Sequence, residues 1–214
     1  MWLQPQPQLA QDPAEWLGDA HPLVEQLCTA DGLASLEGLA ESLRTRRVAD
    51  LPALRDFLRL HRERVLLPCE LPAIRTAFEH ASRNELRELI AFDRQLANEP
   101  ALRKFAGASR RVGLGQLQKL RPLRDERMVQ RYLAAVEVKE AHGWHTLVYG
   151  LTLAVYSLPL RQGLLGYAHQ TTRGFIHAAA RGLKLTEAEC RAVFDELCAP
   201  LPSAVDLLVG KMAA

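Results

Sequence analysis

Aromatic and β-branched residues are scarce in this sequence, and their scarcity narrows the possible folds. Aromatic residues make up 6% of the 214 residues, and leucine and alanine outnumber valine, isoleucine and threonine. Because leucine and alanine favour helices and β-branched residues favour strands, the composition predicts a helical backbone. With 48% hydrophobic and 24% charged residues, the chain has the balance of a globular protein, which excludes disorder for most of its length. The length predicts one domain.

Lysine and net charge are also low. Of the 27 basic residues 22 are arginine and 5 are lysine, against 25 acidic residues, so the formal net charge is +2. A charge so close to neutral does not by itself attract a polyanion, and a nucleic-acid function has to rest on local clustering. Arginine is typical of protein interfaces, because the planar guanidinium makes bidentate contacts at a lower cost of dehydration than lysine.

Zinc-type cysteine spacing and a secretory segment are both missing. The four cysteines lack the paired spacing of a zinc site and are expected to be reduced. They are Cys28, Cys69, Cys190 and Cys198. Residues 1–13 carry no basic start and no apolar run, so they are predicted to be a flexible N-terminal tail and not a signal peptide. Residues 14–214 are predicted to form the single domain of a cytoplasmic protein.

Helical periodicity runs along nearly all of this domain. Apolar residues recur every three or four positions, the spacing of an amphipathic helix. The pattern predicts helices over residues 14–27, 32–43, 51–65, 70–80, 86–97, 100–120, 124–141 and 186–198, with a helix pair between residues 142 and 180. Pro200 and Pro202 are predicted to leave only a short last turn. About ten helices without a strand define an all-α, single-domain helical bundle.

Prolines and capping residues mark several expected helix ends. Asp50 directly precedes the third helix and is typical of an N-cap. Pro68 is predicted to end that helix. Residues 82–85 and 186–189 read as capping boxes, because each segment starts with a serine or threonine and carries a glutamate three positions later.

The segment between residues 142 and 180 is almost uncharged. Its only charged residues are Arg161 and Arg173. Such a segment can form either a membrane hairpin or a buried helix pair. Residues 143–160 barely reach the length of a bilayer span, contain several polar residues and meet Pro159. A central buried helix pair is therefore favoured, and no membrane association is expected.

Motifs of catalysis are not found. Gly113-Leu114-Gly115 lacks the lysine ending and the preceding strand of a phosphate-binding loop. Carboxylates such as Glu85, Glu88 and Asp93 fall on amphipathic surface faces, and none is predicted to be buried, so no general acid and base pair is proposed. We therefore expect a protein that is not an enzyme and has no catalytic residues.

The histidines do not form a recognisable metal site. His142 and His145 stand three positions apart, but no third ligand is adjacent, so a structural or capping role is favoured. His169 and His177 are expected to pack in the core or at an interface. No metal and no cofactor are predicted.

Basic residues are concentrated between residues 103 and 131. This stretch holds nine basic residues against two acidic ones. The basic residues are Arg103, Lys104, Arg110, Arg111, Lys119, Arg121, Arg124, Arg127 and Arg131. The cluster has the charge to meet phosphate, but no helix-turn-helix signature accompanies it, so a solvated face or a face for an acidic protein is favoured.

Several segments, taken in order, resemble the urease accessory protein UreF family. They are Arg47-Val48-Ala49-Asp50, Glu70-Leu71-Pro72-Ala73-Ile74-Arg75, Ala108-Ser109-Arg110-Arg111-Val112-Gly113 with Leu117, residues 142–150, Leu164-Leu165-Gly166-Tyr167 and Ala178-Ala179-Ala180-Arg181. The resemblance covers about residues 23–198. It implies an all-α, non-catalytic chaperone component that works as a homodimer with UreD and the GTPase UreG in nickel insertion into the urease apoprotein.

The resemblance also points to candidate interface residues and leaves alternatives open. By matching positions, the partner interface is expected to include Ser109, Arg110, Gly113, Tyr167 and Arg181. His169 is added to this candidate interface as a histidine that can pack against a partner. For Tyr167 and Gly113, simple packing is an equally weighted alternative. A helical nucleic-acid-binding regulator that uses residues 103–131 remains the second functional class, although nucleic acid is not the favoured partner. An enzyme comes third, since it would need a buried polar cluster that sequence does not reveal.

Overall fold

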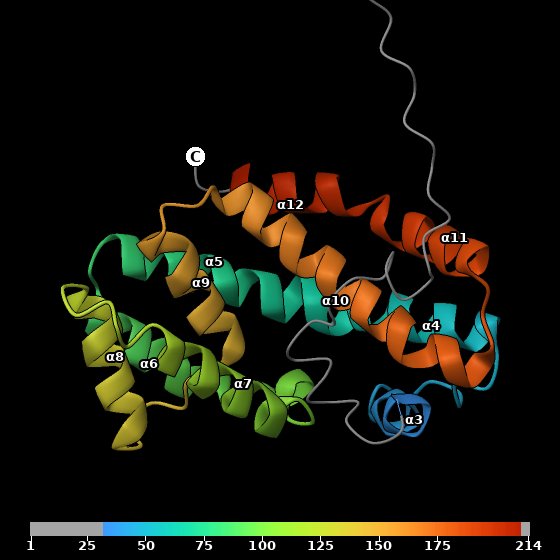
Figure 1. Ribbon diagram of the computed structural model, residues 1–214, viewed down its shortest axis with the longest axis horizontal. Coiled ribbons are helices and arrows are strands. Elements are labelled where there is room, and N and C mark those ends of the chain that lie inside the picture. The colour runs from blue at the N-terminus through green and yellow to red at the C-terminus, as the bar shows by residue number, and fades with distance from the viewer. Residues whose placement is uncertain (1–31, 211–214) are drawn as a thin grey trace, which may run out of the picture.

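The computed structural model describes residues 32–210, and these residues form helices and no strand (Figure 1). The helices are α3 (Gly32–Ser42), α4 (Leu51–His61), η1 (Arg62–Glu70), α5 (Leu71–Ser82), α6 (Leu86–Leu96), η2 (Pro100–Leu102), α7 (Ala106–Lys119), α8 (Arg127–Glu137), α9 (His145–Val155), α10 (Leu160–Leu183), α11 (Glu187–Cys198) and α12 (Leu201–Gly210). The predicted all-α class is confirmed, and the expected number of about ten helices is close. The predicted tail 1–13 and the helix expected over residues 14–27 lie outside the described residues.

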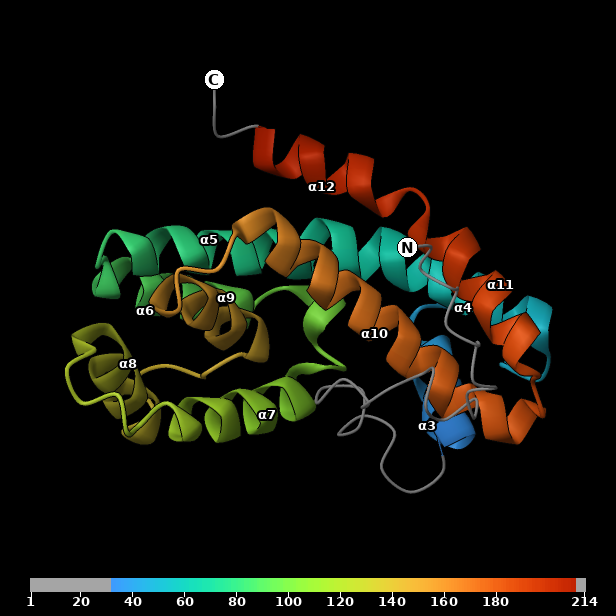
Figure 2. The same cartoon turned by 45° about the horizontal axis from the view of Figure 1, so that its top comes forward.

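One long helical rod organises the molecule. Helix α4, the segment η1 and α5 follow one another without a break. In Figures 1 and 2, α6, α7 and α8 lie on one side of this rod, while α11 and α12 lie on the other. Helix α9 packs between α5 and α7, and α10 crosses the rod in contact with α3, α4, α5, α11 and α12. The short helix α9 thus joins α7 to the rod.

The rod passes through Pro68, so the prediction that this proline ends a helix is wrong. The start of α4 agrees with the prediction, because the Asp50 carboxylate accepts a hydrogen bond from the Ala53 N–H at 2.7 Å. Around Pro68 the chain widens into the π-helical segment η1, in which the Leu71 N–H donates to the carbonyl of Leu66, five residues earlier. The wider turn accommodates a residue that has no N–H of its own.

Several helices end on a left-handed residue that is not glycine. These residues are Arg44, Asn84, Lys139, Ser157 and Lys184, each with φ between 51° and 62°. At Asn84, the N–H of Glu85 donates to the carbonyl of His80 at 2.8 Å, and the Asn84 N–H donates to that of Ala81 at 3.1 Å. This pair of bonds is a Schellman motif.

Of the two predicted capping boxes, only the one at Thr186 is present. Ser82 is the last residue of α5, and Glu85 precedes α6 without a side-chain cap, so the capping box predicted over residues 82–85 is wrong. At Thr186 the hydroxyl accepts from the Glu189 N–H at 3.3 Å, and the Glu189 carboxylate accepts from the Thr186 N–H at 2.8 Å. The second capping box is therefore confirmed.

The C-terminal prolines do not prevent a helix. Helix α12 spans ten residues, so the expected short turn is wrong. Pro202 occupies the second position of α12, where a backbone N–H is not needed for the helical ladder. The Arg161 guanidinium joins α10 to α12 through contacts of 2.6 and 3.1 Å with the Asp206 carboxylate.

The apolar segment forms the predicted buried helix pair, α9 and α10. Leu147 and Leu151 of α9 and Leu164 of α10 are fully buried. No helix within residues 32–210 is long and apolar enough to cross a membrane. The pair therefore forms part of the core, which spreads over both sides of the rod.

Candidate partner interface

A buried carboxylate on α6 holds the start of α9. Both oxygens of Asp93 accept hydrogen bonds: the Tyr132 hydroxyl donates at 2.6 Å, and the backbone N–H groups of His142 and Gly143 donate at 2.5 and 2.9 Å. The Trp144 indole N–H donates to the backbone carbonyl of Asp93 at 3.1 Å. Asp93 thus connects α6 to α8 and to the chain that enters α9.

The prediction that Asp93 lies on a surface face is wrong, because its side chain is fully buried. The spacing of apolar residues along α6 does indicate that Asp93 is buried. Leu89 stands four residues before Asp93 and Leu96 stands three residues after it, and both are buried. The carboxylate therefore lies on the apolar stripe of α6, where an unpaired acid would be costly.

Helix α7 also contacts the segment that enters α9, residues 143–145. The Ser109 hydroxyl accepts a hydrogen bond from the His145 N–H at 3.0 Å. A Cβ added to Gly113 would lie 1.9 Å from the carbonyl oxygen of Gly143, so only glycine permits this approach. The structure therefore brings Ser109 and Gly113 together at the start of α9, and both are buried.

Arg110, between these two residues, reaches the surface. Its guanidinium lies over the Trp144 ring at 4.8 Å from the ring centroid. Arg110 is half-buried, so the aromatic ring orients the side chain while part of it meets solvent. Of the three α7 candidates, Arg110 is the one whose side chain reaches the surface.

Tyr167 of α10 is fully buried in a second polar cluster. Its ring centroid lies 5.7 Å from that of His145 and 5.2 Å from that of Tyr149. The Tyr149 hydroxyl donates to the Gly163 carbonyl at 3.1 Å. The hydroxyl of Tyr167 interacts with the carboxyl of Glu70, which ends η1.

Burial controls the protonation of this second cluster. Burial raises the pKa of Glu70 to about 7, and the interaction with the Tyr167 hydroxyl lowers that pKa by less than burial raises it. Burial, together with the charge of Glu70, raises the pKa of Tyr167 well above its ordinary value. Burial also lowers the pKa of His145 to about 4, so this imidazole stays neutral near pH 7.

Glu70 was also missed in the sequence, and its signal resembles that of Asp93. The buried residues Leu66 and Ile74 stand four positions before and after it. The expectation that no carboxylate is buried is therefore wrong at two positions. With Glu70 only 2% exposed and Tyr167 fully buried, a substrate cannot reach either group in this conformation.

The other α10 candidates face different surroundings. His169 is half-buried, with its ring centroid 5.7 Å from that of Phe194 on α11, and burial and the charge of Arg173 lower its pKa. Arg181 is exposed in the last turn of α10. Tyr167, His169 and Arg181 therefore do not form one patch with one another.

The histidines and cysteines are spread over the fold. Within residues 32–210 no group of three or more histidine, cysteine or acidic side chains is placed to hold a metal ion. His142 donates its backbone N–H to Asp93, and its ring lies 6.4 Å from the Trp144 ring. Cys69, Cys190 and Cys198 are free thiols, and Cys28 lies outside the described residues.

The basic residues lie between η2 and α7, on α7, in the α7–α8 loop and on α8. Most of its members are exposed, but Arg110 packs on Trp144 and Arg121 forms an ion pair with Glu137. The exposed members without an ion pair in the described part of the chain are Arg103, Lys104, Arg111, Lys119, Arg124, Arg127 and Arg131. Two of the nine charges thus have partners inside the fold.

Taken together, these features define an all-α protein in which four of the six candidate interface residues lie at buried polar clusters: Ser109, Arg110, Gly113 and Tyr167. Residues 48–198 match the UreF family. Because the match covers more than half of the chain, the protein belongs to the UreF family of urease accessory proteins, which implies an accessory role in urease maturation and interaction with other urease accessory proteins. No curated protein in the comparison matches the chain.

Proposed function

We propose that this protein binds UreD and a UreG-type GTPase and thereby assists nickel insertion into the urease apoprotein. The observation that carries the proposal is the UreF match, which spans α4 to α11 and includes all six candidate interface residues. The protein acts through its surfaces in the cytoplasm as a homodimer, and nickel is cargo of the assembly. Catalysis by this chain is not part of the proposal.

The burial pattern divides the candidate residues into two roles. Ser109, Gly113 and Tyr167 are buried, so they act as positioning residues that hold α7, α9 and α10 together. Arg110, His169 and Arg181 reach the surface and are the residues that meet partners. The ring of Trp144 orients Arg110 in advance, so this side chain loses less freedom when it pairs with an acidic group.

The test is co-purification of the full chain with UreD and UreG in the presence of GTP. A complex of the three proteins is the expected result. Failure to form it under conditions in which an established UreF protein does would overturn the proposal. Light scattering on the free protein measures the dimer, whose expected mass is twice the 23.9 kDa of one chain.

Surface variants locate the interface within that experiment. Arg181→Glu and Arg110→Glu each reverse a charge at a proposed contact and are expected to weaken the complex by about tenfold or more. Arg59→Glu on α4 is the matched control, because Arg59 is exposed and lies outside the candidate set. Equal weakening by all three variants would show a general charge effect and not a defined interface.

Nucleic-acid binding through residues 103–131 is the alternative that the charge asymmetry favours. It requires retention on duplex DNA that falls steeply with salt and is lost when Arg110, Arg111, Arg121 and Arg124 are reversed. Two of these four residues, Arg110 and Arg121, already contact Trp144 and Glu137. The family match and these internal contacts both favour the protein partners.

A further inference from the structure

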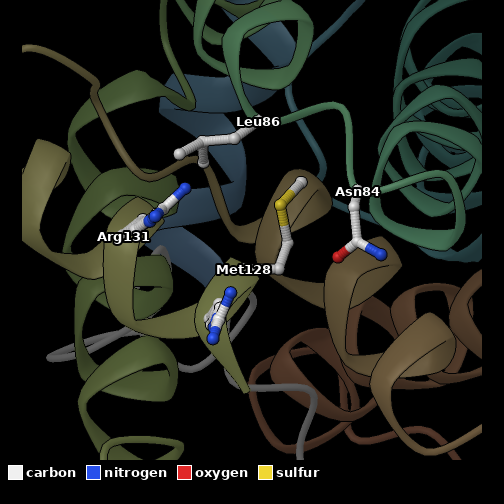
Figure 3. Close-up of a pocket in the computed structure, with 5 residues that line it drawn as sticks. Asn84, Leu86, Met128 and Arg131 are labelled. Carbon is white, nitrogen blue, oxygen red and sulfur yellow. The ribbon is translucent and has the colours of Figure 1, made fainter. Parts of the chain in front are cut away.

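A pocket lies between the α5–α6 turn and α8, away from the start of α9. Its volume is about 290 Å³. Its lining residues are Asn84, Leu86, Arg127, Met128 and Arg131. Figure 3 shows the Met128 side chain between Asn84 on one side and Leu86 and Arg131 on the other. The pocket therefore combines an apolar part with polar and cationic groups.

The charge of the pocket is not neutralised by the fold. Arg127 and Arg131 are both exposed, and neither forms an ion pair with a carboxylate of the described chain. They stand four positions apart on α8, where side chains are neighbours and like charges repel. An anion between them would relieve this repulsion and accept hydrogen bonds from both guanidinium groups.

The remaining walls are preformed and partly apolar. Met128 is only 6% exposed, and Leu86 is half-buried at the start of α6. Asn84 is held by the Schellman hydrogen bonds that end α5, so its backbone is fixed before any ligand arrives. A small volume, an apolar floor and two cations together fit a compact molecule that carries a dianionic group on an apolar stem.

We propose that this pocket binds a small organic phosphate, with the phosphate between Arg127 and Arg131 and the apolar stem against Met128 and Leu86. The guanidinium groups supply charge and paired donors that match phosphate oxygens. The side-chain amide of Asn84 is the further polar group of the lining. This site is independent of the proposed interface with other urease accessory proteins, and either proposal stands if the other fails.

Calorimetry with three probes tests the ligand class. Phenyl phosphate is expected to bind at least about tenfold more tightly than inorganic phosphate, because its ring buries apolar surface. Benzoate, which carries one charge on the same ring, is expected to bind more weakly than phenyl phosphate. Absence of phenyl phosphate binding at millimolar concentration, or equal affinity for phenyl phosphate and inorganic phosphate, would overturn the proposal.

Matched arginine variants test the location. Arg127→Gln and Arg131→Gln are each expected to weaken phenyl phosphate binding by about tenfold, because each removes a charge-assisted contact. Arg124→Gln is the control, since Arg124 is exposed in the α7–α8 loop but does not line the pocket. Circular dichroism checks that each variant is folded. Equal weakening by Arg124→Gln would show binding to the basic surface at large and contradict a defined pocket.

Discussion

Asp93 and Glu70 are both buried carboxyl groups, but their surroundings differ. Asp93 accepts three hydrogen bonds on its carboxylate and one on its backbone carbonyl. Glu70 interacts with Tyr167, and burial raises its pKa to about 7. The comparison teaches that two equally buried carboxyl groups can have different roles: Asp93 anchors several donors, whereas burial holds Glu70 close to its protonated form.

The two carboxyl regions meet at the first turn of α9. Trp144 contacts Asp93, whereas the next residue, His145, lies against Tyr167 of the Glu70 cluster. One short helix is therefore anchored on one side by a carboxylate that accepts three hydrogen bonds and on the other by the cluster of His145, Tyr167 and Glu70. Identical acid-to-amide substitutions at the two positions are expected to separate these roles.

Asp93→Asn is expected to cost the most stability, about 3 kcal/mol at neutral pH. The amide cannot accept at both oxygen positions, so at least one buried donor among Tyr132, His142 and Gly143 loses its partner. Urea denaturation of the variant and the wild type measures the loss. A change below about 1 kcal/mol would show that the hydrogen bonds to Asp93 do not anchor α9.

Glu70→Gln is expected to act in the opposite direction, and only at higher pH. The carboxyl titrates at about 7 in the fold against 4.5 in the unfolded chain, so the folded state binds more protons between these values. Stability from Glu70 is complete below pH 4.5 and is lost as the pH rises through 7. Relative to wild type, the variant should gain about 3 kcal/mol between pH 4 and pH 8.

The measurement for Glu70 is urea denaturation of both proteins across that pH range. Contributions of all other titrating groups cancel in the difference between the two proteins. A difference that does not change with pH would show that burial does not hold Glu70 near its protonated form.

Gly113→Ala tests the contact between α7 and the start of α9. The expected loss in the free energy of unfolding is about 2 kcal/mol or more. The new Cβ would meet the Gly143 carbonyl at 1.9 Å, next to the N–H that Asp93 binds. Gly115→Ala in the same helix is the control, because no atom lies within 4 Å of its added Cβ. That variant is expected to gain about 1 kcal/mol from helix propensity, and equal effects in thermal melts would refute the close contact.

The smallest effect is expected at Lys139, which ends α8 just before the residues that bind Asp93. Its φ of 62° is left-handed, so Lys139→Gly should stabilise the protein by about 1 kcal/mol. Ala134→Gly, at an exposed position inside α8, should instead cost about 1 kcal/mol. Destabilisation by both glycines in urea titrations would show that the left-handed cap carries no strain.

Periodicity predicted the helical class and the buried α9–α10 pair well, because apolar spacing directly reports which face is covered. Helix ends were harder. Pro68 lies within a π-helical turn, and the left-handed caps are Asn84 and Lys184, where glycine would be the usual sequence signal. A local pattern does not show when a wider turn or a non-glycine cap is tolerated.

The sequence indicated some residues of the candidate site but not the buried acids. The α7 segment around Ser109 was singled out through the family resemblance, and the structure joins it to the start of α9. The buried acids were missed because their donors come from elements far away in the sequence. Asp93, for example, is paired with groups 39 to 51 residues later, a distance that helical periodicity does not span.

The most direct test of the proposed role is urease activation in cells that lack their own UreF protein but retain the other accessory proteins and a nickel supply. The full chain is expected to restore nickel content and urease activity, and Arg181→Glu is expected to restore less of both than the control Arg59→Glu. Urease that stays free of nickel, although the chain is folded and bound to UreD and UreG, would contradict a role in nickel insertion.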